Sequence, residues 1–135
     1  MNTDTYKVLK LISGENIICE LTEDDGKYEI SKPLLMHVHP NITIGGMTES
    51  LMLSRWVQPF TEQKYFKIDP KHVIIMLPAS PGLSIFYEGV IYKLERLYDK
   101  AKDVAASTGE TITEAFERLK KAAGFNEGGM PHKRK

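Results

Sequence analysis

The sequence predicts a mainly β protein, a small and strongly bent antiparallel barrel of five strands, with two α-helices after it. In the first part of the chain, short runs of alternating apolar and polar residues give the period of half-buried strands. Gly14 and the pair Asp25-Gly26 stand between these runs, where hairpin turns need permissive backbone. From Ser80 onward the apolar spacing changes to three and four residues, which is the period of an amphipathic helix.

Three strands open the chain and are expected to form a meander. In the first two, apolar side chains such as Leu9, Leu11 and Cys19 recur at every second position, so each strand has one face that needs a core. The third contains Pro33, which has no N–H for a ladder hydrogen bond and therefore marks an edge, a bulge or a sharp bend. A bend would let this long strand serve both walls of a small barrel. We predict the three strands at about residues 6–12, 16–24 and 27–39.

Two further strands follow before the helices. The fourth is predicted in TESLMLSRWVQPF, which comes after a Gly-Gly turn and offers Leu51, Leu53 and Trp56 for burial. Residues 59–71 are predicted to form a loop. The fifth strand, at residues 72–77, is apolar at nearly every position, as expected where both faces are covered or one edge meets another subunit.

Two helices are predicted after the barrel. Ser80 is a good N-cap and Pro81 suits the first helical position, so an amphipathic helix of roughly 25 residues is expected to begin there. Gly109 ends it, and Thr111 with Glu114 forms a capping box that opens a second, shorter helix. The long apolar stripe of the first helix is expected to lie against the barrel or a partner subunit, because such a stripe is seldom left in water.

The predicted organisation is one domain with appendages. A chain of 135 residues is long enough for one domain with a real core, but short for two. The 18 Lys and Arg balance 18 Asp and Glu, so no global field attracts nucleic acid or an anionic membrane. We predict the barrel at residues 1–80, a helical extension at residues 81–124 and a disordered, basic tail at residues 125–135.

The cysteine content and the first residues indicate a reducing compartment. Cys19 is the one cysteine of the sequence, so it cannot form an internal disulfide and is expected to be a small buried hydrophobe. The first residues lack the basic and apolar regions of a leader, and no apolar run approaches the roughly 20 residues of a membrane-spanning helix. We therefore expect a soluble, cytoplasmic protein.

The opening hairpin carries a spaced set of apolar, small and acidic residues. The set is Leu11, Gly14, Cys19, Leu21 and Asp25. It resembles the Sm1 motif of Sm-like proteins, the family that includes the bacterial Hfq proteins. One departure is Cys19, which stands where that motif usually has a second glycine.

A second stretch, PKHVIIMLPAS, resembles the Sm2 motif of the Hfq proteins. Lys71-His72 opens the predicted fifth strand, and Pro78 and Ser80 close it, with one residue less between the pair and the proline than in that motif. The resemblance covers about residues 6–80. It implies that the predicted barrel is a five-stranded Sm-like barrel.

The resemblance also implies an assembly and a ligand. Sm-like subunits form rings in which the fourth strand of one subunit pairs with the fifth of the next. We therefore expect a homo-oligomer in which closing the ring covers the apolar edge of the fifth strand of each subunit. The loops after the second and fourth strands of such rings bind single-stranded RNA by stacking and hydrogen bonds. The candidate RNA contacts carried over by position are Asp25, Tyr28, Glu29, Lys71 and His72.

Acidic residues near the second turn favour another function. Glu23, Asp24, Asp25 and Glu29 cluster there, and such a cluster repels a phosphate backbone. The alternative is a structural or interaction protein that keeps the barrel for oligomerisation and does not bind RNA. Its long helix would then hold a protein partner or its neighbours.

An aromatic and basic segment follows the predicted fourth strand. Phe60, Tyr65 and Phe66 stand beside Lys64 and Lys67, so the segment could stack single-stranded bases. Aromatic residues of this kind more often cover the edge of a small barrel.

Other chemistry finds little support in the sequence. His37 and His39 would project from one face of a strand, but a histidine pair without a third ligand is more typical of a surface than of a metal site. The sequence has no Gly-rich phosphate loop, no HExxH motif and no nucleophile elbow. We therefore expect neither an enzyme nor a bound cofactor.

Overall fold

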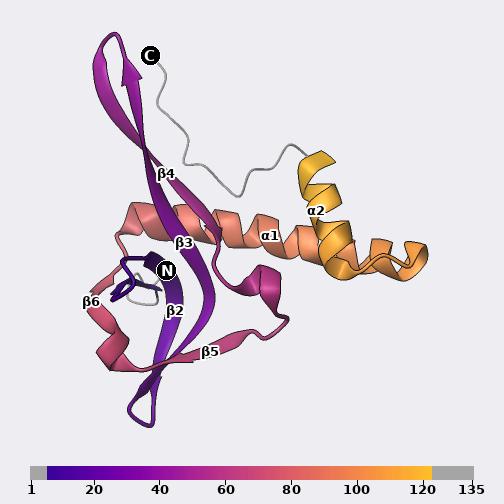
Figure 1. Ribbon diagram of the computed structural model, residues 1–135, viewed down its shortest axis with the longest axis horizontal. Helices are drawn as coiled ribbons and strands as arrows, with labels where there is room; N and C mark the ends of the chain where they lie inside the picture. The colour runs from indigo at the N-terminus through magenta and orange to yellow at the C-terminus, as the bar shows by residue number, and fades with distance from the viewer. Residues whose placement is uncertain (1–5, 123–135) are drawn as a thin grey trace.

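The computed structural model describes residues 6–122 and contains a bent antiparallel sheet followed by two helices (Figure 1). The predicted fold class is confirmed, although the sheet has six strands where the sequence predicts five. The predicted tail at residues 125–135 lies outside the described residues. The elements are β1 (Tyr6–Leu11), β2 (Asn16–Asp24), β3 (Lys27–Thr43), β4 (Gly46–Arg55), β5 (Tyr65–Ile68), β6 (Val73–Pro78), α1 (Pro81–Thr108) and α2 (Ile112–Ala122), with two short 3-10 turns, η2 (Gln58–Phe60) and η3 (Pro70–His72).

The sheet is built round one long, bent strand, β3. The strand order is β4-β3-β2-β1-β6, and β5 lies beside the first part of β3. Residues 28–31 of β3 pair with β5, and pairing with β4 begins at Leu34. Between these two segments Lys32 has a φ of 51°, in the left-handed region, and Pro33 is buried. The predicted bend of the strand at Pro33 is therefore confirmed, and β3 continues through it.

The segment between β4 and β6 differs from the prediction. Tyr65–Ile68 forms β5 within the stretch predicted as a loop, because these residues pair with β3. The fourth strand also ends before Trp56 and does not reach Phe60. The physical reason is Gln58, whose side-chain oxygen accepts hydrogen bonds from the backbone N–H groups of Trp56 and Val57, at 2.7 and 3.0 Å. With their N–H groups already paired, these residues need no partner strand.

The strands β4 and β5 follow one line along β3. Arg55, at the end of β4, is opposite Leu34, and Tyr65, at the start of β5, is opposite Ser31. Residues 56–64 leave the sheet between them (Figure 1). β4 and β5 are therefore one interrupted strand, and the interruption faces the bend of β3.

The sheet has an apolar layer on each side. We call the layer enclosed by the bend the inner core, and the layer between the sheet and α1 the helix-facing core. In β2, Ile17 and Cys19 belong to the inner core and Ile18 belongs to the helix-facing core, which confirms the predicted alternation. The buried residues of the inner core are Leu9, Leu11, Ile17, Cys19 and Ile30; those of the helix-facing core are Ile18, Leu34, Leu53, Ala79, Tyr87, Val90, Leu94, Ala101, Ala105, Ala115 and Phe116.

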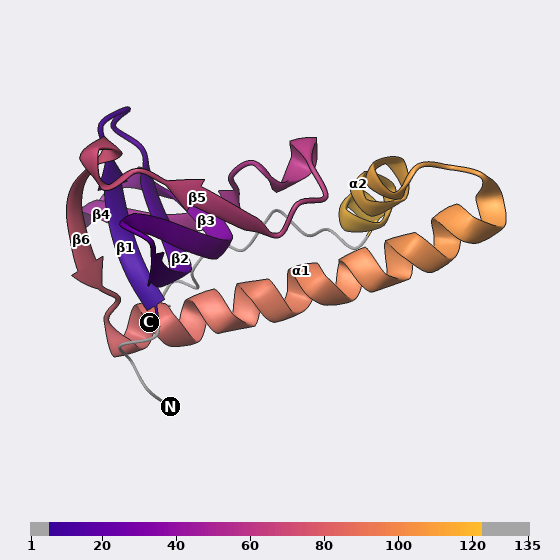
Figure 2. The same cartoon turned by 90° about the horizontal axis from the view of Figure 1, so that it is seen from below.

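The long helix α1 runs along one side of the sheet (Figure 2). Its apolar stripe contributes Val90, Leu94 and Ala101 to the helix-facing core, so the stripe is covered by the chain's own sheet and by α2. Ser80 caps it as predicted, because its hydroxyl accepts a hydrogen bond from the backbone N–H of Leu83 at 3.2 Å. Neither helix within residues 6–122 combines the length and apolarity needed to span a bilayer.

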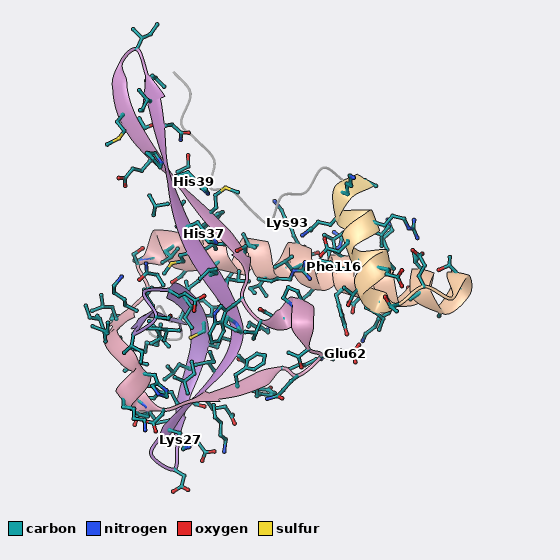
Figure 3. All side chains as sticks on the ribbon, in the orientation of Figure 1. Lys27, His37, His39, Glu62, Lys93 and Phe116 are labelled. Atoms are coloured by element: carbon teal, nitrogen blue, oxygen red, sulfur yellow. The ribbon has the colours of Figure 1, made fainter. Side chains whose placement is uncertain are left out.

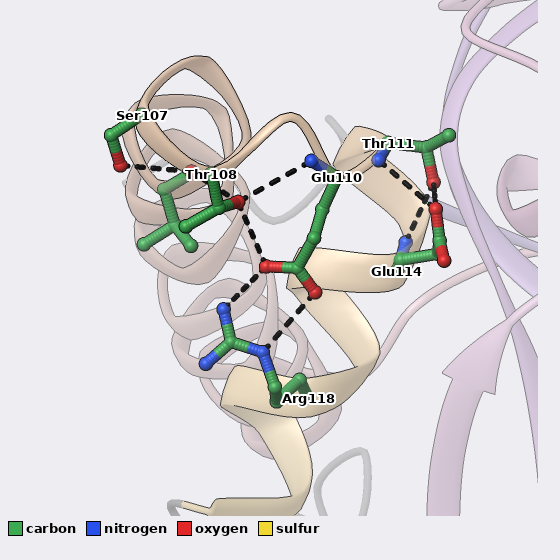
Figure 4. Close-up of polar contacts among 7 residues, drawn as sticks. Ser107, Thr108, Glu110, Thr111, Glu114 and Arg118 are labelled. Carbon is green, nitrogen blue, oxygen red and sulfur yellow. Dashed lines mark hydrogen bonds and ion pairs between the residues drawn. The ribbon is translucent and has the colours of Figure 1, made fainter.

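A reversal after α1 brings α2 back toward it. Gly109 ends α1 with a φ of 80°, which favours glycine. The backbone N–H of Thr111 donates to the Glu114 carboxylate and the backbone N–H of Glu114 donates to the Thr111 hydroxyl, both at 3.1 Å. Figure 4 shows this capping box beside the ion pair between Arg118 and Glu110. The predicted start of the second helix is confirmed.

The hairpin of β3 and β4 projects past α1 (Figure 1). On its helix-facing side, Met36 and Leu53 pack into the helix-facing core. Farther out on the same side, Val38, Ile42 and Met47 are exposed. The hairpin therefore continues an apolar face beyond the part that α1 covers.

Candidate nucleic-acid interface

A cavity of about 530 Å³ lies at one end of the bent sheet. Four segments far apart in the sequence surround it: the β1–β2 turn, the start of β3, the residue that follows β4, and the end of β5 with its connection to β6. Its apolar lining comes from Leu11, Ile12, Trp56 and Ile68. We call this space the end cavity.

The polar lining of the end cavity has more lysines than carboxylates. Lys27, Lys67, Lys71 and His72 contribute to it, and all four side chains are exposed. The other polar residues that line it are Ser13, Glu15 and Asp69. Cations around an apolar, partly aromatic floor suit a ligand that has both a ring system and negative charge.

The β5–β6 connection is held in place by Asp69. Its carboxylate caps η3 by accepting a hydrogen bond from the backbone N–H of Lys71 at 3.0 Å. This hydrogen bond, together with the positive charges of Lys71, His72 and Lys27, holds the pKa of Asp69 below its usual range. The carbonyl of His72 accepts a hydrogen bond from the backbone N–H of Ile12 at 2.9 Å. That hydrogen bond joins the two turns that border the cavity.

Trp56 enters the cavity lining from the point where β4 leaves the sheet. Its indole N–H donates a hydrogen bond to the carboxylate of Glu15 at 3.4 Å. The same carboxylate oxygen accepts a hydrogen bond from the hydroxyl of Ser13 at 3.1 Å. The Trp56 side chain also packs against the inner core. The ring is therefore held between the β1–β2 turn and the inside of the sheet.

Of the five candidate RNA contacts, the structure brings two into the end cavity. Lys71 and His72 both line it. Asp25 is exposed in the β2–β3 turn with a φ of 51°, and it lies outside this lining. Tyr28 and Glu29 are half-buried in β3, opposite Ile68 and Lys67 of β5, and also lie outside the lining. The role of all five in RNA binding stays a prediction.

Sequence reasoning did not assign Lys27, Lys67 and Trp56 to a common site with Lys71 and His72. Lys27 directly follows the Asp25-Gly26 turn, and Lys67 was grouped only with the nearby aromatic residues. Trp56 was assigned to the buried side of a strand. No sequence signal groups these three residues, because the cavity forms between segments that are more than 10 residues apart in the sequence.

The acidic residues of the β2–β3 turn are partly balanced by a lysine. A carboxylate oxygen of Asp24, at the end of β2, lies 3.5 Å from the ammonium nitrogen of Lys67, in β5. Both side chains are more than half exposed, so the pair contributes little to stability. The ion pair nevertheless places the positive charge of Lys67 beside the acidic cluster. The sequence alone does not show that this lysine is near the cluster.

The aromatic and basic segment does not act as one surface. Phe66 packs against the inner core, whereas Tyr65 is exposed. The side chain of Phe60 lies outside those that the structure describes. Lys67 lines the end cavity, whereas Lys64 and Tyr65 line a different hollow, which lies between residues 58–66, α1 and α2.

We call this second hollow the helix groove; its volume is also about 530 Å³. It is lined by equal numbers of cationic and anionic side chains: Lys32, Arg55, Lys64 and Lys102, and Glu20, Glu62, Glu95 and Asp99. The ammonium group of Lys32 lies between the carboxylates of Glu20 and Glu95, at 3.6 and 3.5 Å. Arg55 stacks over the ring of Phe116, 4.3 Å from its centroid. The groove therefore has no net field that would favour phosphate.

The two histidines lie elsewhere. The ring centroids of His37 and His39 are 6.3 Å apart, as expected for two side chains on one face of a strand. Figure 3 shows both on the projecting hairpin, well away from Lys27 at the start of β3. Within residues 6–122, no group of three or more His, Cys, Asp and Glu side chains could hold a metal ion.

A family model described as an Sm_like domain matches residues 8–88. This range is more than half of the chain and includes most of β1, the other five strands and the start of α1. No curated protein matches the chain.

Proposed function

Because the chain belongs to the Sm-like family, we propose that it is the subunit of a ring that binds single-stranded RNA. Both the ring and the RNA follow from what the family resemblance implies. A cytoplasmic location and the lack of enzymatic activity remain part of the same proposal.

The ring is supported by two open edges of the sheet. Among the described strands, β6 pairs only with β1 and β4 pairs only with β3. These are the edges that correspond to the predicted fifth and fourth strands. On β6 the side chains of Ile74, Ile75 and Leu77 are each about half exposed. An edge-to-edge contact between β4 and β6 of neighbouring subunits would cover them, and repetition of that contact closes a ring.

RNA binding is supported by the end cavity. The observation that carries this proposal is that three lysines, Lys27, Lys67 and Lys71, line the same cavity as apolar side chains and the indole of Trp56. One of these lysines, Lys71, belongs to the stretch that resembles the Sm2 motif. Exposed lysines supply the phosphate contacts that dominate affinity for nucleic acids, and an apolar floor accepts bases.

The experiment is fluorescence anisotropy with labelled A-rich and U-rich RNA oligomers at two salt concentrations. The oligomeric mass of the protein is measured first by light scattering. We expect a mass of several subunits, and affinity that falls as salt rises. Lys71→Ala should weaken binding, whereas Lys100→Ala, which removes an exposed lysine from α1, should not. A ring that binds neither RNA at low salt would contradict the proposal.

The second candidate function is an assembly module that does not bind RNA. The acidic β2–β3 turn and the helix groove favour it, because the groove offers a protein partner both apolar surface and charges of both signs. Under this function the light-scattering mass is that of a ring while the anisotropy of either RNA stays unchanged. The two functions are thus separated by the same experiment.

A further inference from the structure

We propose that Trp56 is the surface on which one base of the bound RNA stacks, with Lys27 and Lys67 beside the adjoining phosphate. The inference rests on the proposed RNA binding and assigns a subsite to it. It goes beyond the five positions that the family resemblance supplies, none of which is a tryptophan.

The first argument is the position of the indole. Trp56 lines the end cavity, and it is half-buried, so part of its ring remains accessible. The hydrogen bond to Glu15 and the contact with the inner core hold the ring without a ligand. A ring held in advance loses little conformational entropy when a base stacks on it.

The second argument is the size of the cavity. Sites for small organic ligands have volumes of roughly 300–1,000 Å³ and mostly apolar walls. The end cavity has about 530 Å³, and Leu11, Ile12 and Ile68 line it beside Trp56. A nucleobase with its sugar is a ligand of this class.

The third argument is the arrangement of charge. Lys27 and Lys67 come from β3 and β5, so they flank the cavity from two strands that lie side by side. Glu15 and Asp69 also line it, and an ionised carboxylate can only accept hydrogen bonds. The carboxylates therefore suit the amino group of a base, while the lysines suit phosphate. Because the carboxylates and the lysines would contact different parts of the nucleotide, acidic side chains are compatible with a nucleotide site.

The local fold also places Trp56 there for a physical reason. The side chain of Gln58 binds the backbone N–H groups of Trp56 and Val57, which takes both residues out of the ladder of β4. The amide nitrogen of Gln58 also donates to the carbonyl of Pro33, at 2.5 Å, and so ties this segment to the bend of β3. Trp56 is thus the first residue of the segment that leaves the sheet, and its indole lines the end cavity.

The test uses the fact that Trp56 is the one tryptophan of the sequence. Intrinsic tryptophan fluorescence of the full chain is followed during titration with a six-nucleotide oligoadenylate, in parallel with anisotropy of the labelled oligomer. We expect the fluorescence to be quenched and to saturate at the RNA concentration at which anisotropy saturates. Trp56→Ala should weaken binding about 5- to 150-fold, the effect of losing one stacked base.

Control variants separate stacking from folding. Trp56→Phe keeps an aromatic surface and should bind within a few-fold of the unchanged protein. Lys27→Ala and Lys67→Ala should each reduce the slope of log affinity against log salt by somewhat less than one, whereas Lys100→Ala should leave the slope unchanged. Thermal unfolding of each variant shows whether it is folded at the temperature of the titration. Should Trp56→Ala unfold, the fluorescence of the unchanged protein still decides the question.

The outcomes distinguish this inference from the proposed function. RNA that raises anisotropy without changing tryptophan fluorescence overturns the subsite and leaves RNA binding intact. Quenching with equal loss in Trp56→Ala and Trp56→Phe also overturns it, because stacking predicts that phenylalanine retains most of the affinity. An absence of RNA binding at low salt overturns both.

Discussion

The helix-facing core and the β6 edge are both apolar, yet the single chain covers only one of them. On the helix-facing side, Leu34 and Leu53 are fully buried beneath α1. On β6, Ile74 and Leu77 remain 57% and 54% exposed. The chain completes the first surface with its own helix and leaves the second open. Apolar surface of this kind, along a strand with an unpaired edge, is a typical site of association between subunits.

Removing a side chain from the covered surface should have the largest effect on stability. Leu53→Ala leaves a cavity beneath α1 and should lower the free energy of unfolding by about 2–5 kcal/mol. The matched control is Ile85→Ala, which removes an apolar side chain that is 63% exposed on α1. Urea denaturation measures both. Equal losses in the two variants would show that α1 does not cover the sheet as described.

A smaller loss is expected at the hydrogen bond between α1 and the bend of β3. The Tyr87 hydroxyl donates to the carbonyl of Lys32 at 2.5 Å, and burial raises the pKa of Tyr87 so that the hydroxyl stays protonated. Tyr87→Phe leaves that carbonyl without its partner and should cost about 1–3 kcal/mol of unfolding free energy. Tyr92→Phe, at an exposed position, is the control and should leave the urea midpoint unchanged.

On the open surface, a charge should change assembly and leave the stability of the single chain almost intact. Ile75→Lys places an ammonium group on β6, and its effect on the unfolding free energy of an isolated subunit should stay within about 0.5 kcal/mol. Because a lysine on an edge strand opposes strand pairing, the mass from light scattering should fall toward that of one subunit. Ile75→Val keeps the apolar edge and should keep the mass. A multi-subunit mass for Ile75→Lys would point to another interface.

Ionisation of the Cys19 thiol should not affect the free energy of unfolding at neutral pH, but it should lower that free energy at alkaline pH. Burial raises the pKa of this thiol from 9.0 to about 12. The unfolded chain therefore loses this proton at lower pH than the folded protein, so stability falls as pH rises from about 9 toward 12. The urea midpoint should decline more steeply between pH 8 and 10.5 for the unchanged protein than for Cys19→Ala. Parallel declines would mean that the thiol is not in the inner core.

Much of the fold could be predicted because its signals are local. Ser80, Gly109 and the pair Thr111 with Glu114 set the helix boundaries through their own backbone hydrogen bonds or dihedral angles. The Asp25-Gly26 turn joins β2 to β3 with φ values of 51° and 76°, as a two-residue hairpin loop requires. Such features depend on a few neighbouring residues, so the sequence displays them directly.

What could not be predicted depends on contacts between distant segments. β5 is only four residues long, too short for its alternation to stand out, and its pairing with β3 is what makes it a strand. Trp56 was expected on the buried side of β4, because nothing local reveals that Gln58 binds its backbone. The end cavity likewise forms only once four distant segments of the chain meet. Lys71 and His72 were found through a motif, and Lys27, Lys67 and Trp56 needed the structure.

The interrupted strand has a consequence for how the chain could be cut. Residues 61–64 are exposed, and Lys64 stands immediately before β5, where trypsin could cleave. In the C-terminal fragment that such a cut produces, β5 would still pair with β3 and β6 would still pair with β1 of the N-terminal fragment. The helix α1 would still pack in the helix-facing core. Residues 1–64 and 65–135 should therefore remain bound to each other after limited proteolysis. Expressed as separate polypeptides, they should reassemble as complementing fragments.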